Sequence, residues 1–208
     1  MTAAKIVLAG NPNCGKTALF NALTGSSQRV GNWPGVTVDC KQGTMAIANQ
    51  TCNVLDLPGV YSLFSYGDQC ALDTKIACDY LLSEPVDLIV NVLDAANLER
   101  HLYLTTQLLD LGLPMVIALN MMDVLERRGG SIDCAALSKR LGCPVIPIIA
   151  SQSHNIDALQ SSICHQLKLA SPAVSVLNLP PAVESLRDQV SADLIGCAAS
   201  TNTAFMAL

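Results

Sequence analysis

Residues 10–17 read GNPNCGKT and directly follow the apolar run IVLA at 6–9. The glycines let the backbone curl so that successive N–H groups face inward, and a helix starting near Gly15 aims the positive end of its dipole at the same point. Such a nest binds an anion. Lys16 can reach the β and γ phosphates of a nucleotide, and the Thr17 hydroxyl can ligate Mg²⁺. The stretch therefore predicts a phosphate-binding loop between a strand and a helix.

Apolar runs of strand length alternate with helical patterns along the rest of the chain. The runs are residues 5–10, 53–57, 86–94, 114–120 and 144–150. Runs that are apolar on both faces are typical of parallel strands covered by helices on each side. Helices are expected at about 15–25, 69–82, 97–111, 133–141 and 155–169, with Asn97 as an N-cap and Gly25, Gly112 and Gly142 as stops. The alternation predicts an α/β fold with a doubly wound, mostly parallel sheet and helices on both faces.

Two segments depart from this alternation. Residues 37–48 (TVDCKQGTMAIA) alternate apolar and polar side chains, which predicts a further strand, as an antiparallel edge. The pattern breaks at Ser171-Pro172, and the residues after this point are expected to form a linker and a proline-started helix. We predict a first domain at 1–168 and a partial helical segment at 169–208, too short for a core of its own.

Composition narrows the classes of partner. The chain has 208 residues and a net charge of −5, so it lacks the clustered basic residues typical of nucleic-acid binders, and no nucleic-acid partner is expected. The nine cysteines form no CxxC pair, and we interpret them as reduced, buried residues of a cytosolic protein. No apolar run approaches the roughly 18 residues that span a bilayer, so we expect this polypeptide to be soluble.

Two further motifs end predicted strands and indicate the nucleotide. Asp56-Leu57-Pro58-Gly59 puts a carboxylate where it can hold the magnesium shell, while Gly59 offers its N–H to a γ-phosphate. Asn120-Met121-Met122-Asp123 ends a later strand, and the Asp123 carboxylate can accept both donors of a guanine edge, which adenine lacks. The order of the motifs predicts a P-loop GTPase of the Ras-like type.

The segment between the phosphate loop and Asp56 is rich in turn-forming residues. Residues 26–39 (SSQRVGNWPGVTVD) are long for a loop, and long loops are commonly functional. Thr37 is the best candidate for a switch threonine that closes on Mg²⁺ through its hydroxyl and on the γ-phosphate through its N–H. Thr44 and Thr51 are poorer candidates because they fall in or after the next strand.

The motifs together resemble the N-terminal G domain of the bacterial ferrous iron transport protein B family. GNPNCGKT, VGNWPGVTV, DLPGVYSL and NMMD carry the resemblance, which covers about residues 4–168, and NVLDAANLERHLYL and LGCPVIPI are similar between them. The resemblance implies a cytosolic GTPase at the cytoplasmic face of the bacterial inner membrane. Through a helical domain it would serve a membrane iron-permease domain of the same full-length protein, which imports Fe²⁺, with small cytosolic accessory proteins as further partners.

The resemblance also implies a set of site residues. Residues 35–39 would be switch I, 56–59 would open switch II, Asn120 and Asp123 would read guanine, and 149–151 would approach the base through backbone N–H groups. The residues expected to contact GTP or GDP are Gly10, Asn11, Pro12, Asn13, Cys14, Gly15, Lys16, Thr17, Gly35, Val36, Thr37, Val38, Asp39, Asp56, Leu57, Pro58, Gly59, Asn120, Met121, Met122, Asp123, Ile149, Ala150 and Ser151. Those expected to act in catalysis are Lys16, Thr37, Asn13 and Gly59. The metal ligands would be Thr17, Thr37 and Asp56 for Mg²⁺ and Asn13 for K⁺.

Val60 follows Gly59 where Ras-type enzymes carry a water-orienting glutamine, and an isopropyl group cannot do that work. We expect K⁺ at Asn13 to supply the missing charge and the Thr37 backbone to orient the water.

Met121 and Ser151-Gln152 depart from commoner GTPase sequences, which predicts micromolar nucleotide binding and quick GDP release. Two alternatives stay open: a potassium-dependent GTPase acting on RNA or tRNA, and an ATP-dependent kinase or small-molecule binder.

Overall fold

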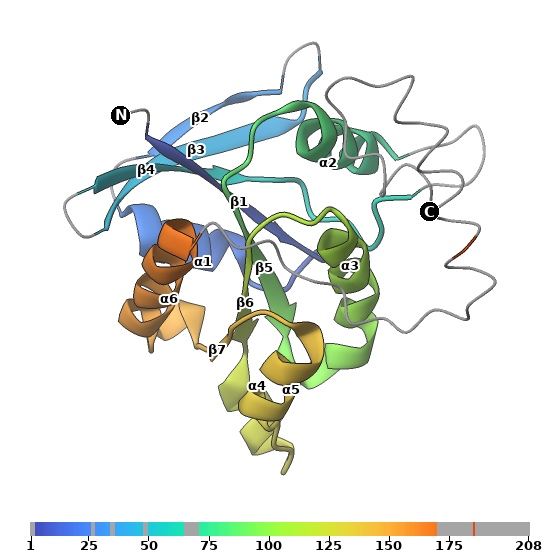
Figure 1. The fold of residues 1–208 in the computed structure, drawn as a ribbon, viewed down its shortest axis with the longest axis vertical. Helices are drawn as coiled ribbons and strands as arrows, with labels where there is room; N and C mark the ends of the chain where they lie inside the picture. The colour runs from blue at the N-terminus through green and yellow to red at the C-terminus, as the bar shows by residue number, and fades with distance from the viewer. Residues whose placement is uncertain are drawn as a thin grey trace.

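The computed structural model describes residues 3–25, 28–33, 36–47, 50–64 and 71–169, together with Ser185. In these ranges seven strands form one sheet in the order β2-β3-β4-β1-β5-β6-β7 (Figure 1). The strands are β1 (Ala4–Gly10), β2 (Gln28–Asn32), β3 (Asp39–Ile47), β4 (Gln50–Asp56), β5 (Leu88–Asp94), β6 (Met115–Asn120) and β7 (Val145–Pro147). The helices are α1 (Lys16–Thr24), α2 (Leu72–Ser83), α3 (Leu98–Asp110), α4 (Met122–Arg127), α5 (Cys134–Leu141) and α6 (Ile156–Leu169), with 3₁₀ turns η1 (Ala95–Asn97) and η2 (Ala150–Gln152).

The central strands are parallel, as the apolar runs predict. β1 pairs in parallel with β4 on one side and with β5 on the other, and β5, β6 and β7 continue the parallel ladder. Every residue of β5 (LIVNVLD) is buried, as expected of a strand covered by helices on both faces. The predicted doubly wound α/β sheet is confirmed.

The outer strands correct one expectation. β3 is antiparallel to β4, as predicted. β3 is not the edge strand, however, because β2 pairs antiparallel with the other side of β3 and forms the edge. Residues 28–32 therefore form a strand and not part of a loop. Four of the five β2 residues are exposed, so β2 has no buried face to leave a pattern in the sequence. β2 is a strand because its backbone pairs with β3, and strand formation of this kind depends on the neighbouring strand more than on the intrinsic propensity of the residues.

Helices cover both faces of the sheet. α1 and α6 pack on one face, where Phe20 and Ile163 are fully buried, and α2, α3 and α5 pack on the other, where Leu108 is fully buried. Figure 1 shows the first pair together on one side and α2 and α3 on the opposite side. This layering directs the carboxyl ends of β1, β4, β5 and β6 toward one edge, where open α/β sheets bind ligands.

The helix signals are largely confirmed. Gly25, with φ 56°, is the C-cap of α1. Asp133 is the N-cap of α5, its carboxylate accepting from Ala136 N at 2.9 Å, and Gly142, with φ 67°, is the C-cap. Asn97 precedes α3, but its side chain makes no capping bond there; its Nδ2 donates to Asp94 Oδ2 instead. The short α4 was not predicted.

The segment after α6 lies outside the described residues, apart from Ser185. The linker and the proline-started helix expected there, and the domain boundary at 168/169, therefore stay predictions. Among the helices that are described, none is both long and apolar enough to cross a bilayer.

Candidate functional site

The loop after β1 has the backbone conformation of an anion nest. Asn13 and Gly15 have φ values of 63° and 88°, and the N–H of Cys14 donates to the carbonyl of Asn11 at 3.4 Å. Gly15 is the N-cap of α1, and no side chain satisfies the N–H groups of the first turn there. These groups are free to bind an anion in the loop.

Close backbone approaches require glycine at two positions of this loop. A Cβ on Gly15 would overlap Asn120 Nδ2, and a Cβ on Gly10 would lie 2.6 Å from the carbonyl oxygen of Val92. Neither approach is tolerable, and at Gly15 the positive φ adds strain for any other residue. The glycines of GNPNCGKT therefore let the loop pack against β5 and β6.

A hollow of about 520 Å³ opens in front of this loop. Its lining residues are Asn11, Pro12, Asn13, Gly15, Lys16, Thr17, Ala18, Gly59 and Asp73. The structure thus brings together seven residues that the sequence predicted at the site. Asp73, in the first turn of α2, adds a carboxylate to the lining that no motif signalled.

Asp56 joins this group through an ion pair. Its Oδ1 lies 2.5 Å from Lys16 Nζ, and the two side chains are only 6% and 11% exposed. A buried charge must be paired or ligated. If Lys16 pairs with an anionic ligand, the Asp56 carboxylate therefore needs another cation. A phosphate for Lys16 together with Mg²⁺ for Asp56 would meet that condition.

Asn120 connects the phosphate loop to the other end of the site. The side chain is 3% exposed; its Nδ2 donates to the carbonyl of Cys14 and its Oδ1 accepts from Ala150 N, both at 2.9 Å. The amide therefore bonds to the backbone of two loops, one on each side of β6. In this structure Asn120 holds those loops together.

Asp123 lies in the first turn of α4 with a side chain 31% exposed. Arg127, one turn later, donates to its Oδ2 at 2.8 Å and to its carbonyl at 3.1 Å. Met121, with φ 62°, is the N-cap of α4 and turns the chain after β6. Asp123 is thus an accessible carboxylate held beside Arg127. The sequence analysis did not include Arg127, because the helix that brings these two side chains together was not predicted.

Residues 149–151 lie at the carboxyl end of the parallel strands, where Ala150 contacts Asn120. Ile149 N donates to the carbonyl of His154 at 3.3 Å, and His154 N donates back at 3.1 Å, so a small backbone bridge closes the turn. Ala150 is held by Asn120 and is 4% exposed, while Ser151 is exposed. Asn120 thus fixes the backbone at Ala150, and the approach of these residues to a base stays a prediction.

The expected switch I residues are not gathered at the hollow. Val36, Thr37 and Val38 form a bend, and Trp33 N donates to the carbonyl of Val38 at 2.9 Å, closing this bend. Asp39 already belongs to β3. Thr37 is exposed and is absent from the described residues that line the 520 Å³ hollow. Gly35 lies outside the described residues.

Residues 56–59, which are expected to open switch II, lie at the sheet edge. Leu57 is 1% exposed and its N–H donates to the carbonyl of Leu8, while Pro58 and Gly59 leave the sheet edge beside the phosphate loop. A Cβ on Gly59 would lie 3.1 Å from Pro12, so this approach is also tight. Val60 is 5% exposed and belongs to the core.

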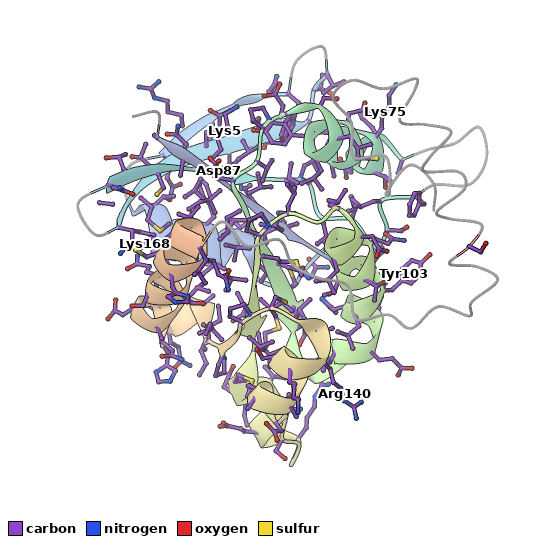
Figure 2. All side chains as sticks on the ribbon, in the orientation of Figure 1. Lys5, Lys75, Asp87, Tyr103, Arg140 and Lys168 are labelled. Carbon is purple, nitrogen blue, oxygen red and sulfur yellow. The ribbon has the colours of Figure 1, made fainter. Side chains whose placement is uncertain are left out.

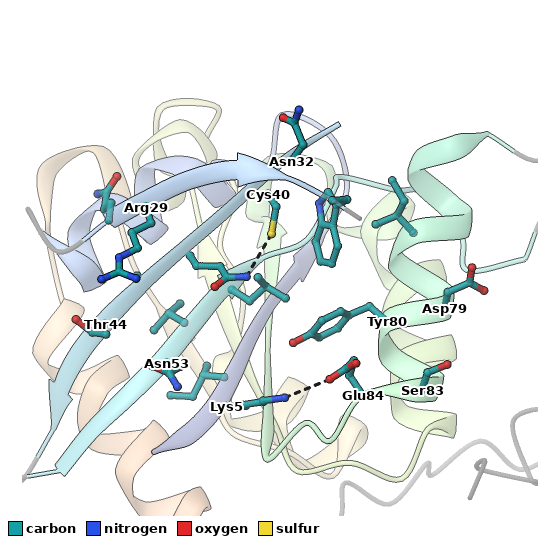
Figure 3. A pocket seen from close by; sticks show the side chains of 18 residues that line it. Lys5, Arg29, Asn32, Cys40, Thr44, Asn53, Asp79, Tyr80, Ser83 and Glu84 are labelled. Atoms are coloured by element: carbon teal, nitrogen blue, oxygen red, sulfur yellow. Dashed lines mark hydrogen bonds and ion pairs between the residues drawn. The ribbon is translucent and has the colours of Figure 1, made fainter. Parts of the chain in front are cut away.

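A larger hollow of about 1030 Å³ lies elsewhere, between α2 and the sheet face formed by β1 to β4 (Figure 3). Lys5 and Glu84 form an ion pair of 3.2 Å across one end of it. Trp33 and Tyr80 line it and meet edge to face, with ring centroids 5.3 Å apart. None of its described lining residues belongs to the phosphate loop or to residues 120–123, so the smaller hollow is the candidate site.

Burial controls the titration of two groups near the site. Desolvation raises the pKa of the Cys14 thiol to about 11, despite the charge of Lys16. Desolvation also lowers the pKa of His101 on α3, partly offset by Asp94. Among the described residues, no cluster of three His, Cys, Asp or Glu side chains could hold a metal ion. A metal here would need ligands from a phosphate as well, as is usual for Mg²⁺.

The glycine loop between β1 and α1, the carboxylate after β4 and the NxxD sequence after β6 lie at one edge of a mostly parallel sheet. This combination defines a P-loop GTPase domain. The family model described as "Ferrous iron transport protein B" matches residues 4–163. The chain therefore belongs to the ferrous iron transport protein B family.

Sequence relatives agree with this assignment. The chain is 54% identical over 158 residues to the Fe(2+) transporter FeoB of Salmonella typhimurium and to that of Escherichia coli K12, which covers 76% of this chain and 20% of each relative. The chain thus spans about a fifth of the length of the curated relatives that it matches. The comparisons do not favour the alternative of a GTPase for RNA or tRNA processing.

Solved structures agree as well. The cytosolic domain of Legionella pneumophila FeoB superimposes with a TM-score of 0.91 at 44% identity, covering 98% of this chain and 87% of that one. The cytosolic domain of the Thermotoga maritima FeoB iron transporter, in a GMPPNP form, gives 0.89 at 37% identity, covering 98% and 79%. The predicted fold class and family are confirmed.

Proposed function

We propose that this chain binds GTP with its phosphates in the 520 Å³ hollow and hydrolyses it to GDP and phosphate. The observation that carries the proposal is the buried pair of Lys16 and Asp56 beside the free N–H groups at the start of α1. These are one cation, one carboxylate and a row of backbone donors, the groups that a magnesium triphosphate needs. The GDP and GMPPNP forms of the T. maritima relative support the same ligand class.

Asp123 selects guanine in this proposal. Its carboxylate accepts from N1–H and N2–H₂ of the base, and adenine offers no such pair of donors. Competition of GTP and ATP for a fluorescent guanine nucleotide tests this role, with Glu126→Ala on the same helix as the control. Asp123→Ala should abolish the preference for GTP, and Glu126→Ala should keep it. An unaltered preference in Asp123→Ala would remove the basis of the proposal.

Thr17, Asp56 and Thr37 are the proposed protein groups of a magnesium site. The hydroxyl and the carboxylate are hard oxygen donors of the kind that Mg²⁺ prefers, and Asp56 is already in a position that requires a cation. When bound, the ion would neutralise charge on the phosphates. Thr37 must move to the hollow from its exposed bend, as expected of a switch residue.

Hydrolysis needs a substitute for the glutamine that Val60 replaces. Asn13, with φ 63°, is exposed at the rim of the hollow, where its amide oxygen can ligate K⁺ beside the phosphates. A cation there would stabilise developing negative charge, an effect commonly worth several kcal/mol. The Thr37 backbone would orient the water.

Turnover in KCl, NaCl and LiCl tests the potassium role. We expect faster hydrolysis in KCl, and loss of that difference in Asn13→Ala while GDP binding remains. Equal rates in the three salts would exclude the K⁺ mechanism and leave the GTPase assignment intact.

Nucleotide exchange should be fast. Met121 offers apolar cover to a base but no charge, and Ser151-Gln152 lacks a nearby glycine. We propose micromolar affinity and quick GDP release, measurable by stopped-flow fluorescence. Nanomolar affinity with slow release would contradict this part.

In the full-length protein we propose that the domain controls Fe²⁺ import through a membrane permease domain, at the cytoplasmic face of the bacterial inner membrane. The relatives named Fe(2+) transporter, of which this chain matches 20%, support this placement. Small cytosolic accessory proteins are proposed as further partners. Iron uptake by cells that carry the full-length protein with Asp123→Ala tests the link, and uptake equal to the parent's would contradict it.

A further inference from the structure

The segment directly after Gly59, residues 60–64, packs mostly against α3. Val60 is 5% exposed and its N–H donates to the carbonyl of Gly10 at 3.2 Å. Leu63 is 4% exposed in the core between the sheet and α3. Residues 60–64 thus form an ordered segment beside the phosphate loop.

Gln107 on α3 makes the central contact of this docking. Its side chain is buried, and its Oε1 accepts from Leu63 N at 2.7 Å. Ser62 Oγ lies 3.1 Å from its Nε2 and 3.2 Å from its Oε1. Because the Leu63 N–H is a donor, the atom facing it must be the amide oxygen, which fixes the orientation of the whole group.

Arg100, two turns before Gln107 on the same face of α3, makes two more contacts. Its guanidinium lies 4.1 Å from the ring centroid of Tyr61, and its carbonyl accepts from Asn11 Nδ2 of the phosphate loop at 3.4 Å. Tyr103, by contrast, is 57% exposed and lies on the outer side of α3 (Figure 2). One face of α3 therefore touches both the phosphate loop and the segment that follows Gly59.

This arrangement matters because Val60 has no group that could orient water. The chemical step then depends on backbone groups, Gly59 N–H among them, and a backbone group acts only from the right place. Misplacement by about 1 Å can cost roughly a hundredfold in rate. The bonds that fix residues 60–64 consequently bear on catalysis itself.

We propose that Gln107 is a positioning residue for GTP hydrolysis. It holds the Leu63 N–H and the Ser62 hydroxyl, and through them keeps Gly59 in register with the phosphate loop. The inference rests on the proposed GTPase function. It adds that residues 60–64 keep their contact with α3 while GTP is bound.

Three substitutions separate positioning from simple packing. Gln107→Met keeps the length and removes both polar atoms, while Gln107→Glu keeps oxygen acceptors for the Leu63 N–H and the Ser62 hydroxyl. Thr106→Ala is the control, because its hydroxyl donates only to the carbonyl of Tyr103 on the same helix. Each variant is measured for kcat and KM with GTP, for GDP affinity and for thermal unfolding.

We expect kcat of Gln107→Met to fall at least tenfold at unchanged GDP affinity, as a displaced catalytic backbone predicts. Gln107→Glu should recover most of the rate, and Thr106→Ala should match the parent. A Gln107→Met variant that unfolds at lower temperature but keeps its kcat would show a merely structural role and overturn the proposal. So would failure of Gln107→Glu to recover any activity.

Two measurements keep the proposal testable if Gln107→Met does not fold. Ser62→Ala removes one partner of the same amide and should lower kcat several-fold. Amide exchange at Leu63 in the GMPPNP form of the parent should be slow, because the Leu63 N–H stays bonded to Gln107, and fast exchange in that form would contradict the proposal. A parent chain that binds GTP but never hydrolyses it would instead refute the proposed function.

Discussion

Asn120→Ala should destabilise the fold, although the residue lies in a motif expected to read the base. The side chain bonds to Cys14 O and Ala150 N, each at 2.9 Å, and both residues are at least 96% buried. Removing the amide leaves one carbonyl and one N–H without partners. A buried group left unsatisfied costs about 1–3 kcal/mol, so the pair should cost about 3 kcal/mol.

That figure converts into a measurable shift. In a chain of this size 1 kcal/mol corresponds to about 2–4 °C in Tm, so Asn120→Ala should unfold roughly 6–12 °C below the parent. Thermal unfolding followed by circular dichroism measures the shift. Asn53→Ala, an exposed strand position, is the control and should stay close to the parent.

Asp123→Ala separates the two residues of the motif. Its pair with Arg127 joins exposed groups one turn apart, worth about 0.3–0.5 kcal/mol, so the Tm should hardly move. Asp123→Ala should lose guanine preference at nearly full stability, whereas Asn120→Ala should lose stability together with affinity for any nucleotide. A Tm of Asn120→Ala within about 2 °C of the parent would refute the reasoning that this amide holds the two loops together.

Three further outcomes are expected. Gly25→Ala, at φ 56° and ψ −126° with nothing within 4 Å of the new Cβ, should cost only the backbone strain of about 1–3 kcal/mol. Gly15→Ala should cost clearly more because its Cβ also meets Asn120, and similar urea midpoints for the two variants would contradict this. Cys14 is fully buried and its pKa is raised to about 11, so its thiol should resist N-ethylmaleimide at pH 7.5 in the native state and react in urea. Mass spectrometry measures the labelling, and labelling of Cys14 before the half-buried Cys164 would count against the burial. Burial lowers the pKa of His101 below its ordinary 6.5, so the unfolded chain binds a proton more readily than the folded one, and the stability from neutral His101 is present above about pH 6.5 and is lost as pH falls. His101→Asn should therefore make the free energy of unfolding in urea depend less on pH between 7.5 and 5.5. An unchanged pH dependence would disprove this.

The sequence predicted the parallel core and the place of each motif because both depend on local patterns. The apolar runs of β1, β5 and β6 are buried on both faces, and buried strands of this kind are visible without a structure. The motifs follow strands whose carboxyl ends must share one edge of the sheet. Local pattern and fold topology were enough for these features.

The missing features depend on pairing between distant segments. β2 (Gln28–Asn32) is ordered by β3 and carries almost no buried side chain, so its sequence resembles a loop. Gln107 meets Ser62 across 45 residues, and Asn11 meets Arg100 across 89. No periodicity within a window of the sequence encodes such contacts, and only the structure can assign them.

Arg127 is the one missed residue with a local signal. Four positions after Asp123, it has the spacing at which a helix brings opposite charges together, and the sequence DVLER could have been interpreted that way. The helix itself has only six residues and begins at a left-handed Met121, which gives neither length nor an N-cap signal. The charge spacing alone was therefore too weak to predict α4.

The candidate site relies on backbone groups more than on side chains, and this predicts which substitutions at position 14 the phosphate loop will tolerate. Cys14 contributes its carbonyl to Asn120, while its sulfur lies only 2.9 Å from where a Cβ on Gly10 would stand. A serine of similar size would preserve that carbonyl and the packing, whereas a larger residue would press on Gly10 and displace the loop. We therefore expect the side chain at position 14 to matter through its volume, since burial raises the pKa of its thiol to about 11 and keeps it protonated near neutral pH.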